Sequence, residues 1–157
     1  MADVHLRPVT LTNYKECLAL HLAPTQAEFV ASNAKSLAEA KVNPTLTPLA
    51  IYDAAARGHD LPPVPMLGFG MYEIAAGVGY ILRLMIDHAY QGQGYGRAAT
   101  IEIIRRLRLS PEVEVIGIGY RRDNVVAAHL YHSLGFLPWE PTWAAPDSLD
   151  VYLKWPD

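Results

Sequence analysis

The apolar residues of this chain follow two different periods. In 79–87 the side chains fall on two alternating faces: Tyr80, Leu82, Leu84 and Ile86 on one, and Ile81, Arg83 and Met85 on the other. A period of two predicts a strand. Segments rich in β-branched and aromatic residues predict further strands at 48–53, 66–72, 113–120, 136–143 and 149–155. Turn formers dominate 57–65 and 75–79, which predicts an exposed connection and a tight turn.

The strongest helical pattern runs from Gly94 to about Leu109. Its opposite face is rich in arginine, and its apolar face contains Ala99, Thr100, Ile103, Ile104 and Leu107. A second helix is expected to start at Asp123 or Asn124 and to end at Gly135, because glycine suits the left-handed position after a helix.

Two or three short helices are expected in the first quarter of the chain. Thr12 is placed to cap the first of them. The apolar face of that helix would contain Tyr14, Leu18 and Leu22. Two capping boxes of the S/T-x-x-E form predict the others: Thr25 with Glu28, and Ser36 with Glu39.

These elements predict an α/β (α+β) fold. Strand, helix and strand follow one another between 79 and 120, and such a unit pairs its two strands in parallel. The remaining strands follow one another as hairpins and should be antiparallel. We therefore expect one domain over 1–157, with a mixed, mostly antiparallel central sheet, one parallel βαβ pair and helices on both faces.

Composition narrows the class of protein. The 157 residues are 51% hydrophobic and 18% charged, which suits one globular core. Thirteen Lys and Arg against sixteen Asp and Glu argue against nucleic-acid binding, which needs a basic surplus. A single cysteine, Cys17, suits a reducing compartment. The longest apolar stretch, 74–86, is too short for a bilayer and the N-terminus resembles no signal peptide, so a cytoplasmic protein is expected.

The segment 87–98 carries the clearest chemical signal. It joins a strand to a helix and has glycines at 92, 94 and 96, which allow positive φ angles and a close approach of the backbone to a ligand. The free N–H groups of a helix start favour an anion such as pyrophosphate. The spacing G-x-G-x-G does not match the dinucleotide fingerprint, and the G-K-S/T of a P-loop is absent. A glycine-rich turn without a ligand is the structural alternative.

Two motifs in this region resemble those of the GNAT (GCN5-related N-acetyltransferase) superfamily. Gln91-x-x-Gly94-x-Gly96 is similar to its Q/R-x-x-G-x-G/A pattern, which holds the pyrophosphate of coenzyme A. The residues from Asn124 to Phe136 are similar to its second motif, N-x-x-A-x-x-x-Y-x-x-x-G-F. The resemblance implies a GNAT-like fold and acetyl-CoA as acetyl donor. The implied cofactor-binding residues are Met85, Ile86, Gln91, Gly92, Gln93, Gly94, Tyr95, Gly96, Arg97, Asn124 and Tyr131.

A narrower resemblance concerns the acceptor. Residues 26–40 and 68–72 are similar to those of bacterial spermine/spermidine (diamine) N-acetyltransferases, which implies a polyamine acceptor. One position departs from that group, because Leu82 stands where some relatives have an acid on the strand before Arg83. Such relatives are often homodimers, and 149–155 is a candidate contact between the two copies.

The resemblance also suggests roles in direct transfer through a tetrahedral intermediate. An alkylammonium has a pKa of about 10 and must lose a proton before it attacks, so Glu28 and Glu73 are candidate bases. Tyr131 is the candidate acid near the cofactor sulfur, and backbone N–H groups of Met85 and Ile86 are candidate oxyanion donors. Each side chain also has a purely structural explanation: Glu28 in a capping box, Glu73 as an exposed strand residue and Tyr131 as a buried ring.

Other functions stay open. The acceptor can be a peptide, protein or aminoglycoside amine, and a non-catalytic acyl-CoA-binding module would keep the same cofactor motifs. No metal site is expected, because the histidines lack acid or cysteine partners at ligand spacing. Charge favours a cationic acceptor: 80–125 contains seven arginines and five acids, a net of +2, whereas the rest of the chain carries −5.

Overall fold

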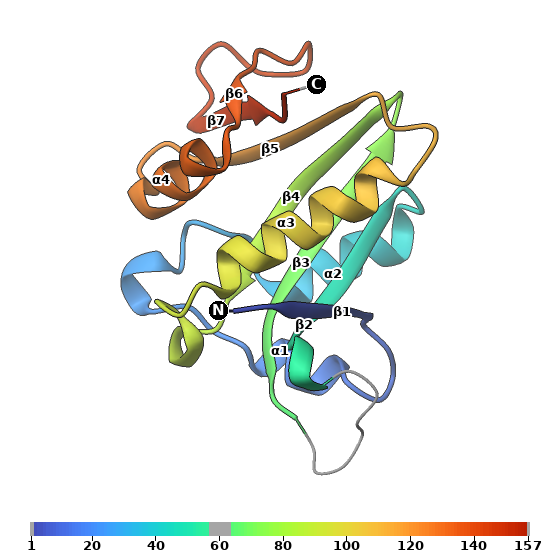
Figure 1. Ribbon diagram of the computed structural model, residues 1–157, viewed down its shortest axis with the longest axis vertical. Coiled ribbons are helices and arrows are strands. Elements are labelled where there is room, and N and C mark those ends of the chain that lie inside the picture. The colour runs from blue at the N-terminus through green and yellow to red at the C-terminus, as the bar shows by residue number, and fades with distance from the viewer. Residues whose placement is uncertain (1, 57–63, 157) are drawn as a thin grey trace.

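A computed structural model describes residues 2–56 and 64–156. The described residues form a seven-stranded sheet in the order β1-β2-β3-β4-β5-β7-β6 (Figure 1). The strands are β1 Val4–Pro8, β2 Leu46–Asp53, β3 Met66–Ala75, β4 Val78–Ile86, β5 Val115–Arg121, β6 Leu137–Pro138 and β7 Asp150–Lys154. The β4–β5 pair is parallel and the other neighbours are antiparallel, which confirms the expected mixed sheet.

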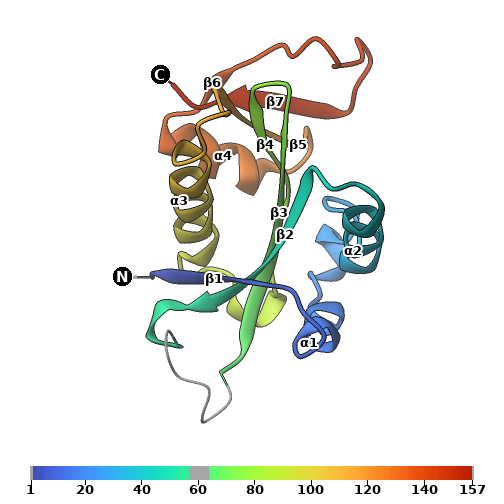
Figure 2. The same ribbon diagram turned by 90° about the vertical axis from the view of Figure 1, so that its right-hand side faces the viewer.

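Helices cover both faces of the sheet, as expected. Helices α1 (Tyr14–Ala19) and α2 (Asn33–Val42) lie on one face, and α3 (Tyr95–Arg108) and α4 (Val125–Leu134) lie on the other (Figure 2). Three 3₁₀ turns complete the described elements: η1 Pro24–Gln26, η2 Ala54–Ala56 and η3 His88–Tyr90.

Each face of the sheet has its own apolar cluster. Because successive side chains of a strand point to opposite faces, β2 contributes Ile51 to the cluster under α3 and α4, and Ala50 to the cluster under α1 and α2. The buried face of α3 is the predicted one, and all five of its members have at most 4% exposure. A tight turn at Ala76 and Gly77, both with positive φ, joins β3 to β4 as expected. The other predicted connection, at 57–65, lies almost entirely outside the described residues.

Several expectations for the first quarter are wrong. Residues 4–8 form a strand that was not expected, because its pairing partner β2 is distant in sequence. Helix α1 starts after Asn13 rather than Thr12, and it buries Cys17 while Leu18 is exposed. The reason is that α1 has fewer than two turns. Where the helix packs against the sheet therefore decides which side chain is buried, and the spacing of its apolar residues does not.

Neither predicted capping box forms. The turn η1 starts after Ala23, and the side chain of its Gln26 accepts a hydrogen bond from the Ala23 N–H, so Thr25 caps nothing. Helix α2 starts one turn earlier than expected, after Ser32, whose hydroxyl accepts from the Lys35 N–H. Ser36 is therefore fully buried inside that helix. Both serines satisfy the local requirement for a cap, and tertiary packing selects between them.

The C-terminal strands are shorter than expected. Of 136–143 only Leu137–Pro138 is a strand, and β7 covers Asp150–Lys154 of the predicted 149–155. Strand β7 lies between β5 and β6, so its backbone is paired on both sides at Leu153 and Lys154. The homodimer contact at 149–155 stays a prediction.

Candidate active site

Strands β4 and β5 separate part-way along their length. Their parallel pairing ends where Ile81 faces Ile118. Beyond this pair, β4 continues along β3 to Ile86, whereas β5 continues along β7 to Arg121 (Figure 1). Past Ile81, no described strand therefore pairs with the β5 side of β4, and its backbone is available to a ligand.

A cavity of about 500 Å³, which we name the loop cavity, lies between the end of β4, the glycine-containing loop and α4. The structure brings ten of the predicted cofactor-binding residues to its wall: Met85, Ile86, Gln91, Gly92, Gly94, Tyr95, Gly96, Arg97, Asn124 and Tyr131. The eleventh, Gln93, is exposed and is not among the lining residues.

The loop cavity suits a pyrophosphate. Gly92 has a φ of 76° and Gly94, the N-cap of α3, a φ of 88°, which explains glycine at both positions. Tyr95, Gly96 and Arg97 form the first turn of α3 and line the cavity. Their N–H groups have no acceptor within the helix, and the positive end of the helix dipole lies behind them. The donor set therefore fits the phosphates of coenzyme A.

Two side chains of the predicted motif bind protein groups. The amide of Gln91 donates to the Ile86 carbonyl at 3.0 Å and pairs with the amide of Gln26. The guanidinium of Arg97 donates to the Ser133 hydroxyl at 2.8 Å and so joins the start of α3 to the end of α4. Both side chains position the walls of the loop cavity.

Tyr95 joins the start of α3 to the end of β2. Its hydroxyl donates to a carboxylate oxygen of Asp53 at 2.7 Å. This hydrogen bond raises the pKa of Tyr95 and lowers the pKa of Asp53. The bond holds the first turn of α3, with its free N–H groups, against the sheet.

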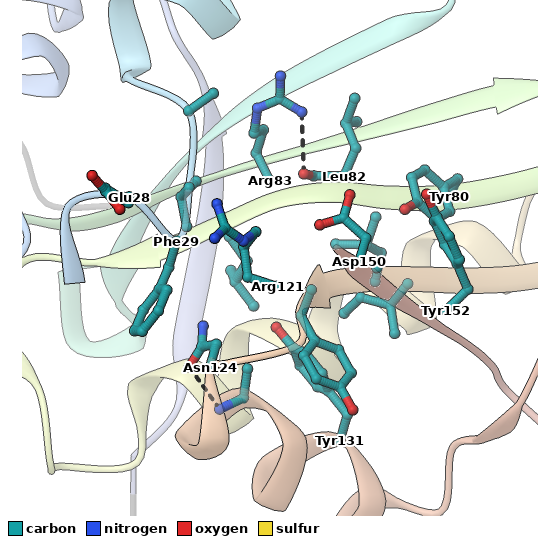
Figure 3. Close-up of a pocket in the computed structure, with 18 of the residues that line it drawn as sticks. Glu28, Phe29, Tyr80, Leu82, Arg83, Arg121, Asn124, Tyr131, Asp150 and Tyr152 are labelled. Carbon is teal, nitrogen blue, oxygen red and sulfur yellow. Dashed lines mark hydrogen bonds between the residues drawn. The ribbon is translucent and has the colours of Figure 1, made fainter. Parts of the chain in front are cut away.

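A second cavity of about 400 Å³, which we name the strand cavity, lies where β4 and β5 diverge (Figure 3). The two cavities share part of their lining: Phe29, Val30, Leu84, Asn124, Ala127 and Tyr131. They meet at α4, so a molecule in one cavity can contact a molecule in the other.

Tyr131 lies at this junction. It is 6% exposed, and its ring packs 5.8 Å from that of Tyr120 and 5.9 Å from that of Phe136. Burial, and to a lesser degree the neighbouring Tyr120, raises the pKa of the Tyr131 phenol far above its ordinary value. The hydroxyl is therefore a permanent hydrogen-bond donor at neutral pH.

Asn124 caps a helix, as predicted, and lies at the wall of both cavities. Its side-chain oxygen accepts from the Ala127 N–H at 3.1 Å, so it caps α4. It also lines the strand cavity (Figure 3) and the loop cavity. Gly135, with a φ of 101°, ends the same helix as predicted.

The two candidate bases lie in different places. Glu28 is exposed and lines the strand cavity. Glu73 is on β3, accepts a hydrogen bond from the Thr45 hydroxyl at 2.9 Å and lines neither cavity. Leu82 lines the strand cavity and packs against the apolar cluster under α1 and α2, whereas Leu84 packs against the other cluster. The expectation that the two leucines share a face is therefore wrong, because the pairing of β3 with β4 shifts register at Leu82.

Residues 25–136 match the model of the acetyltransferase (GNAT) family. The chain belongs to this family. The predicted superfamily resemblance is thereby confirmed, and the chain is an acetyl-CoA-dependent N-acetyltransferase that uses acetyl-CoA as acetyl donor.

Individual relatives differ in the acceptor that their names state. A spermine/spermidine N(1)-acetyltransferase of Bacillus subtilis is 25% identical over 142 residues, or 85% of this chain and 88% of that protein. A mycothiol acetyltransferase of Mycobacterium leprae is 31% identical over 110 residues, or 66% of this chain and 35% of that protein. The structure of PaiA N-acetyltransferase from Thermoplasma acidophilum, in complex with coenzyme A, covers 97% of this chain and 98% of that chain with a TM-score of 0.65 at 13% identity. They support the GNAT fold and leave the acceptor open.

Sequence reasoning missed much of this acetyltransferase's strand cavity. Besides Glu28 and Arg83, charged and aromatic side chains that were not expected there line it, among them Tyr80, Tyr120, Arg121, Asp150 and Tyr152. Alternation places Tyr80 on one face of β4, but no local signal shows that β7 brings Asp150 and Tyr152 beside β5.

The charges of the strand cavity are not balanced. Arg83 is paired with Glu39 at 3.1 Å, and Arg121 lies 3.6 Å from Asp123. Among the described residues, Glu28 and Asp150 have no hydrogen-bond donor or cation paired with their carboxylates. The cavity therefore presents two free carboxylates and two arginines that already have acidic partners.

None of the helices in the described part of the chain combines the length and the apolar character that a bilayer crossing requires.

Proposed function

We propose that this acetyltransferase transfers the acetyl group of acetyl-CoA to a primary amine of a small cationic acceptor, a polyamine such as spermine or spermidine. The observation that carries the proposal is the meeting of the two cavities at Tyr131. The loop cavity would hold the donor, and the strand cavity would hold the amine. The free carboxylates of Glu28 and Asp150 and the named activity of the Bacillus subtilis relative support a cationic acceptor.

Glu28 is the proposed base. It lines the cavity and is exposed, so water can carry the proton from the ammonium to its carboxylate. Glu73 is the weaker alternative, because its carboxylate is bound by Thr45 and lies outside both cavities.

Tyr131 is the proposed donor to the leaving sulfur. Its raised pKa makes it a much weaker acid than a thiol, whose pKa is about 8.5. Tyr131 therefore stabilises the developing thiolate by a hydrogen bond, without complete transfer of its proton. Backbone N–H groups at Met85 and Ile86, beyond the end of the β5 pairing, are the proposed donors to the carbonyl oxygen.

One observation favours a second acceptor class. The Nε of Arg121 is buried without a hydrogen-bond partner, and the residue lines the strand cavity. An acceptor with a carbonyl or carboxylate, such as a peptide or protein amine, would satisfy this donor.

The proposal is tested by acetyl-CoA consumption with spermine, spermidine, putrescine, lysine-containing peptides and aminoglycosides. We expect the highest kcat/KM with a polyamine. A higher value with peptides would favour the second class. Thermal stabilisation by coenzyme A without turnover on any amine would contradict catalysis and indicate a binding module.

A further inference from the structure

Three aromatic rings and one carboxylate gather in the part of the strand cavity formed by β4, β7 and the segment between β6 and β7. Tyr80 lies at the centre of the group, with ring centroids 5.7 Å from Trp143 and 6.3 Å from Tyr152. All three rings line the cavity together with Asp150. Trp143 is about half exposed, which places it at the rim.

Asp150 is held in place by its backbone and not by its carboxylate. Its N–H donates to the Ser148 hydroxyl at 3.0 Å, and it pairs with Arg121 across β5 and β7. Residues directly opposite on antiparallel strands project to the same face, so an Arg121–Asp150 ion pair is the expected result. Instead, Arg121 is directed to Asp123, and the Asp150 carboxylate has no donor among the described residues.

The carboxylate is close enough to Tyr80 for their charges to interact. Burial is the main cause of the raised pKa of Tyr80, and Tyr152 and Asp150 raise it further. In Figure 3, the Asp150 carboxylate lies between Arg121 on one side and Tyr80 on the other. Arg83, which also lines the cavity, acts on Tyr80 in the opposite direction and lowers its pKa.

Gly119 on β5 makes room for this arrangement. A Cβ at this position would collide with the hydroxyl of Tyr80 and would touch the ring of Tyr152. The position of Tyr80 therefore depends on the absence of a side chain at 119.

We propose that Asp150, Tyr80, Trp143 and Tyr152 form a subsite for a second ammonium group of the acceptor, at a distance from the amine that is acetylated. An unpaired carboxylate beside aromatic faces is the arrangement that recognises an ammonium, through charge and cation–π attraction. The subsite rests on the proposed function, and it makes this acetyltransferase selective for diamines and longer polyamines over monoamines.

The wild-type protein tests this selectivity directly. Acetyl-CoA consumption is measured with putrescine, cadaverine and hexamethylenediamine, each against the monoamine of equal chain length: butylamine, pentylamine and hexylamine. We expect kcat/KM to be about tenfold higher for at least one diamine than for its monoamine, as a partly exposed charge and cation–π contact provides. The effect should be in KM, because the reacting amine is the same.

Asp150→Asn tests the contribution of the subsite apart from that of the rest of the cavity. It keeps the shape and the backbone hydrogen bond and removes the charge. The kcat/KM for the diamine should therefore fall toward that for its monoamine, by a much larger factor than any change for the monoamine. Asp147→Asn, in the exposed segment before β7 and outside the cavity lining, is the matched control for net charge and should keep the preference. If Asp150→Asn does not fold, Trp143→Ala, at the half-exposed rim, should still reduce the preference severalfold.

The outcomes are distinct. Equal kcat/KM for diamines and monoamines with the wild type would overturn the subsite and leave amine acetylation intact. An equal loss for both amine classes in Asp150→Asn would also overturn it, because Asp150 would then act on the reacting end. Absence of turnover with every amine would overturn the proposed function, and the subsite with it.

Discussion

The side chains of Gln26 and Gln91 form a reciprocal amide pair, with hydrogen bonds of 3.2 and 3.0 Å. Gln91 also donates to the Ile86 carbonyl, and Gln26 accepts from the Ala23 N–H. One pair thus joins the turn η1, the end of β4 and the glycine-containing loop. Both glutamines line the loop cavity. Phe29, which lies three residues after Gln26 in the chain, lines both cavities.

Gln26→Ala should weaken binding of both substrates. The change leaves the Gln91 amide without one partner and releases the segment that carries Phe29, at a cost of about 1–2 kcal/mol. We expect KM to rise about three- to tenfold for acetyl-CoA and for the amine, with kcat nearly unchanged. Thr25→Ala, at the exposed neighbouring position of the same turn, is the control and should behave as wild type. A loss confined to kcat would argue against this positioning role.

Tyr131→Phe should lower kcat well over tenfold and leave acetyl-CoA affinity nearly unchanged, because it removes one hydroxyl and keeps the ring contacts. Steady-state kinetics and calorimetric binding measure the two quantities. Tyr52→Phe, which removes the hydroxyl of a buried tyrosine outside both cavities, should retain turnover. Unchanged turnover of Tyr131→Phe would exclude the proposed role. Because the pKa of Tyr131 is raised, kcat should show no loss from phenol ionisation up to about pH 10.

Two glycines of the motif should respond in opposite ways to alanine. Gly94→Ala forces a side chain into a left-handed conformation, which costs about 1–2 kcal/mol, and it should lower both the melting temperature and coenzyme A affinity. A Cβ at Gly96 makes only ordinary contacts with Leu130 and Ile86, 3.7 Å and 3.9 Å away. Gly96→Ala should therefore stabilise α3 by up to about 1 kcal/mol and retain coenzyme A binding. Thermal denaturation of the two variants, with and without coenzyme A, measures both effects. Equal destabilisation by the two substitutions would contradict the role of the left-handed conformation at Gly94.

Cys17 should make the free energy of unfolding depend on pH in the alkaline range. Burial raises the pKa of its thiol from 9.0 to about 11, so the folded state favours the protonated form. Below pH 9 the thiol is protonated in both states and its contribution is complete. Between pH 9 and about 11 the unfolded chain ionises first, and the free energy of unfolding falls by up to about 1.4 kcal/mol per pH unit. Urea denaturation at each pH gives the free energy of unfolding of the wild type and of Cys17→Ala, and the difference between the two isolates the contribution of the thiol. A difference that does not change with pH would contradict the prediction.

The division of charge along the chain, with a basic segment at 80–125 and an acidic remainder, does not correspond to the charges of the two cavities. Two of the seven arginines counted in 80–125, Arg83 and Arg121, line the strand cavity and not the loop cavity. The proposed preference for a cation rests instead on pairing: both arginines have acidic partners, whereas no donor or cation among the described residues pairs with Glu28 or Asp150. Which charges are neutralised depends on side-chain contacts, and net charge per segment does not reveal them.

Elements with strong local signals were predictable. Helix α3 has a continuous apolar face and a glycine N-cap, and α4 has an asparagine cap and a terminal glycine, so sequence and structure agree to within a residue or two. Strand β1 was missed because its two buried residues, Val4 and Leu6, carry too short a pattern. What makes it a strand is pairing with β2, more than forty positions away.

The sequence by itself determined the family, the glycine-containing loop and the two helices that line the loop cavity, because capping, glycine conformation and helical periodicity act over a few residues. Only the tertiary structure decided how the strand cavity is built. The divergence of β4 from β5, the position of Asp150 beside Tyr80 and the link from Gln26 to Gln91 each join segments distant in sequence. Such contacts depend on strand order and on which ion pairs form, and neither leaves a periodic pattern along the chain.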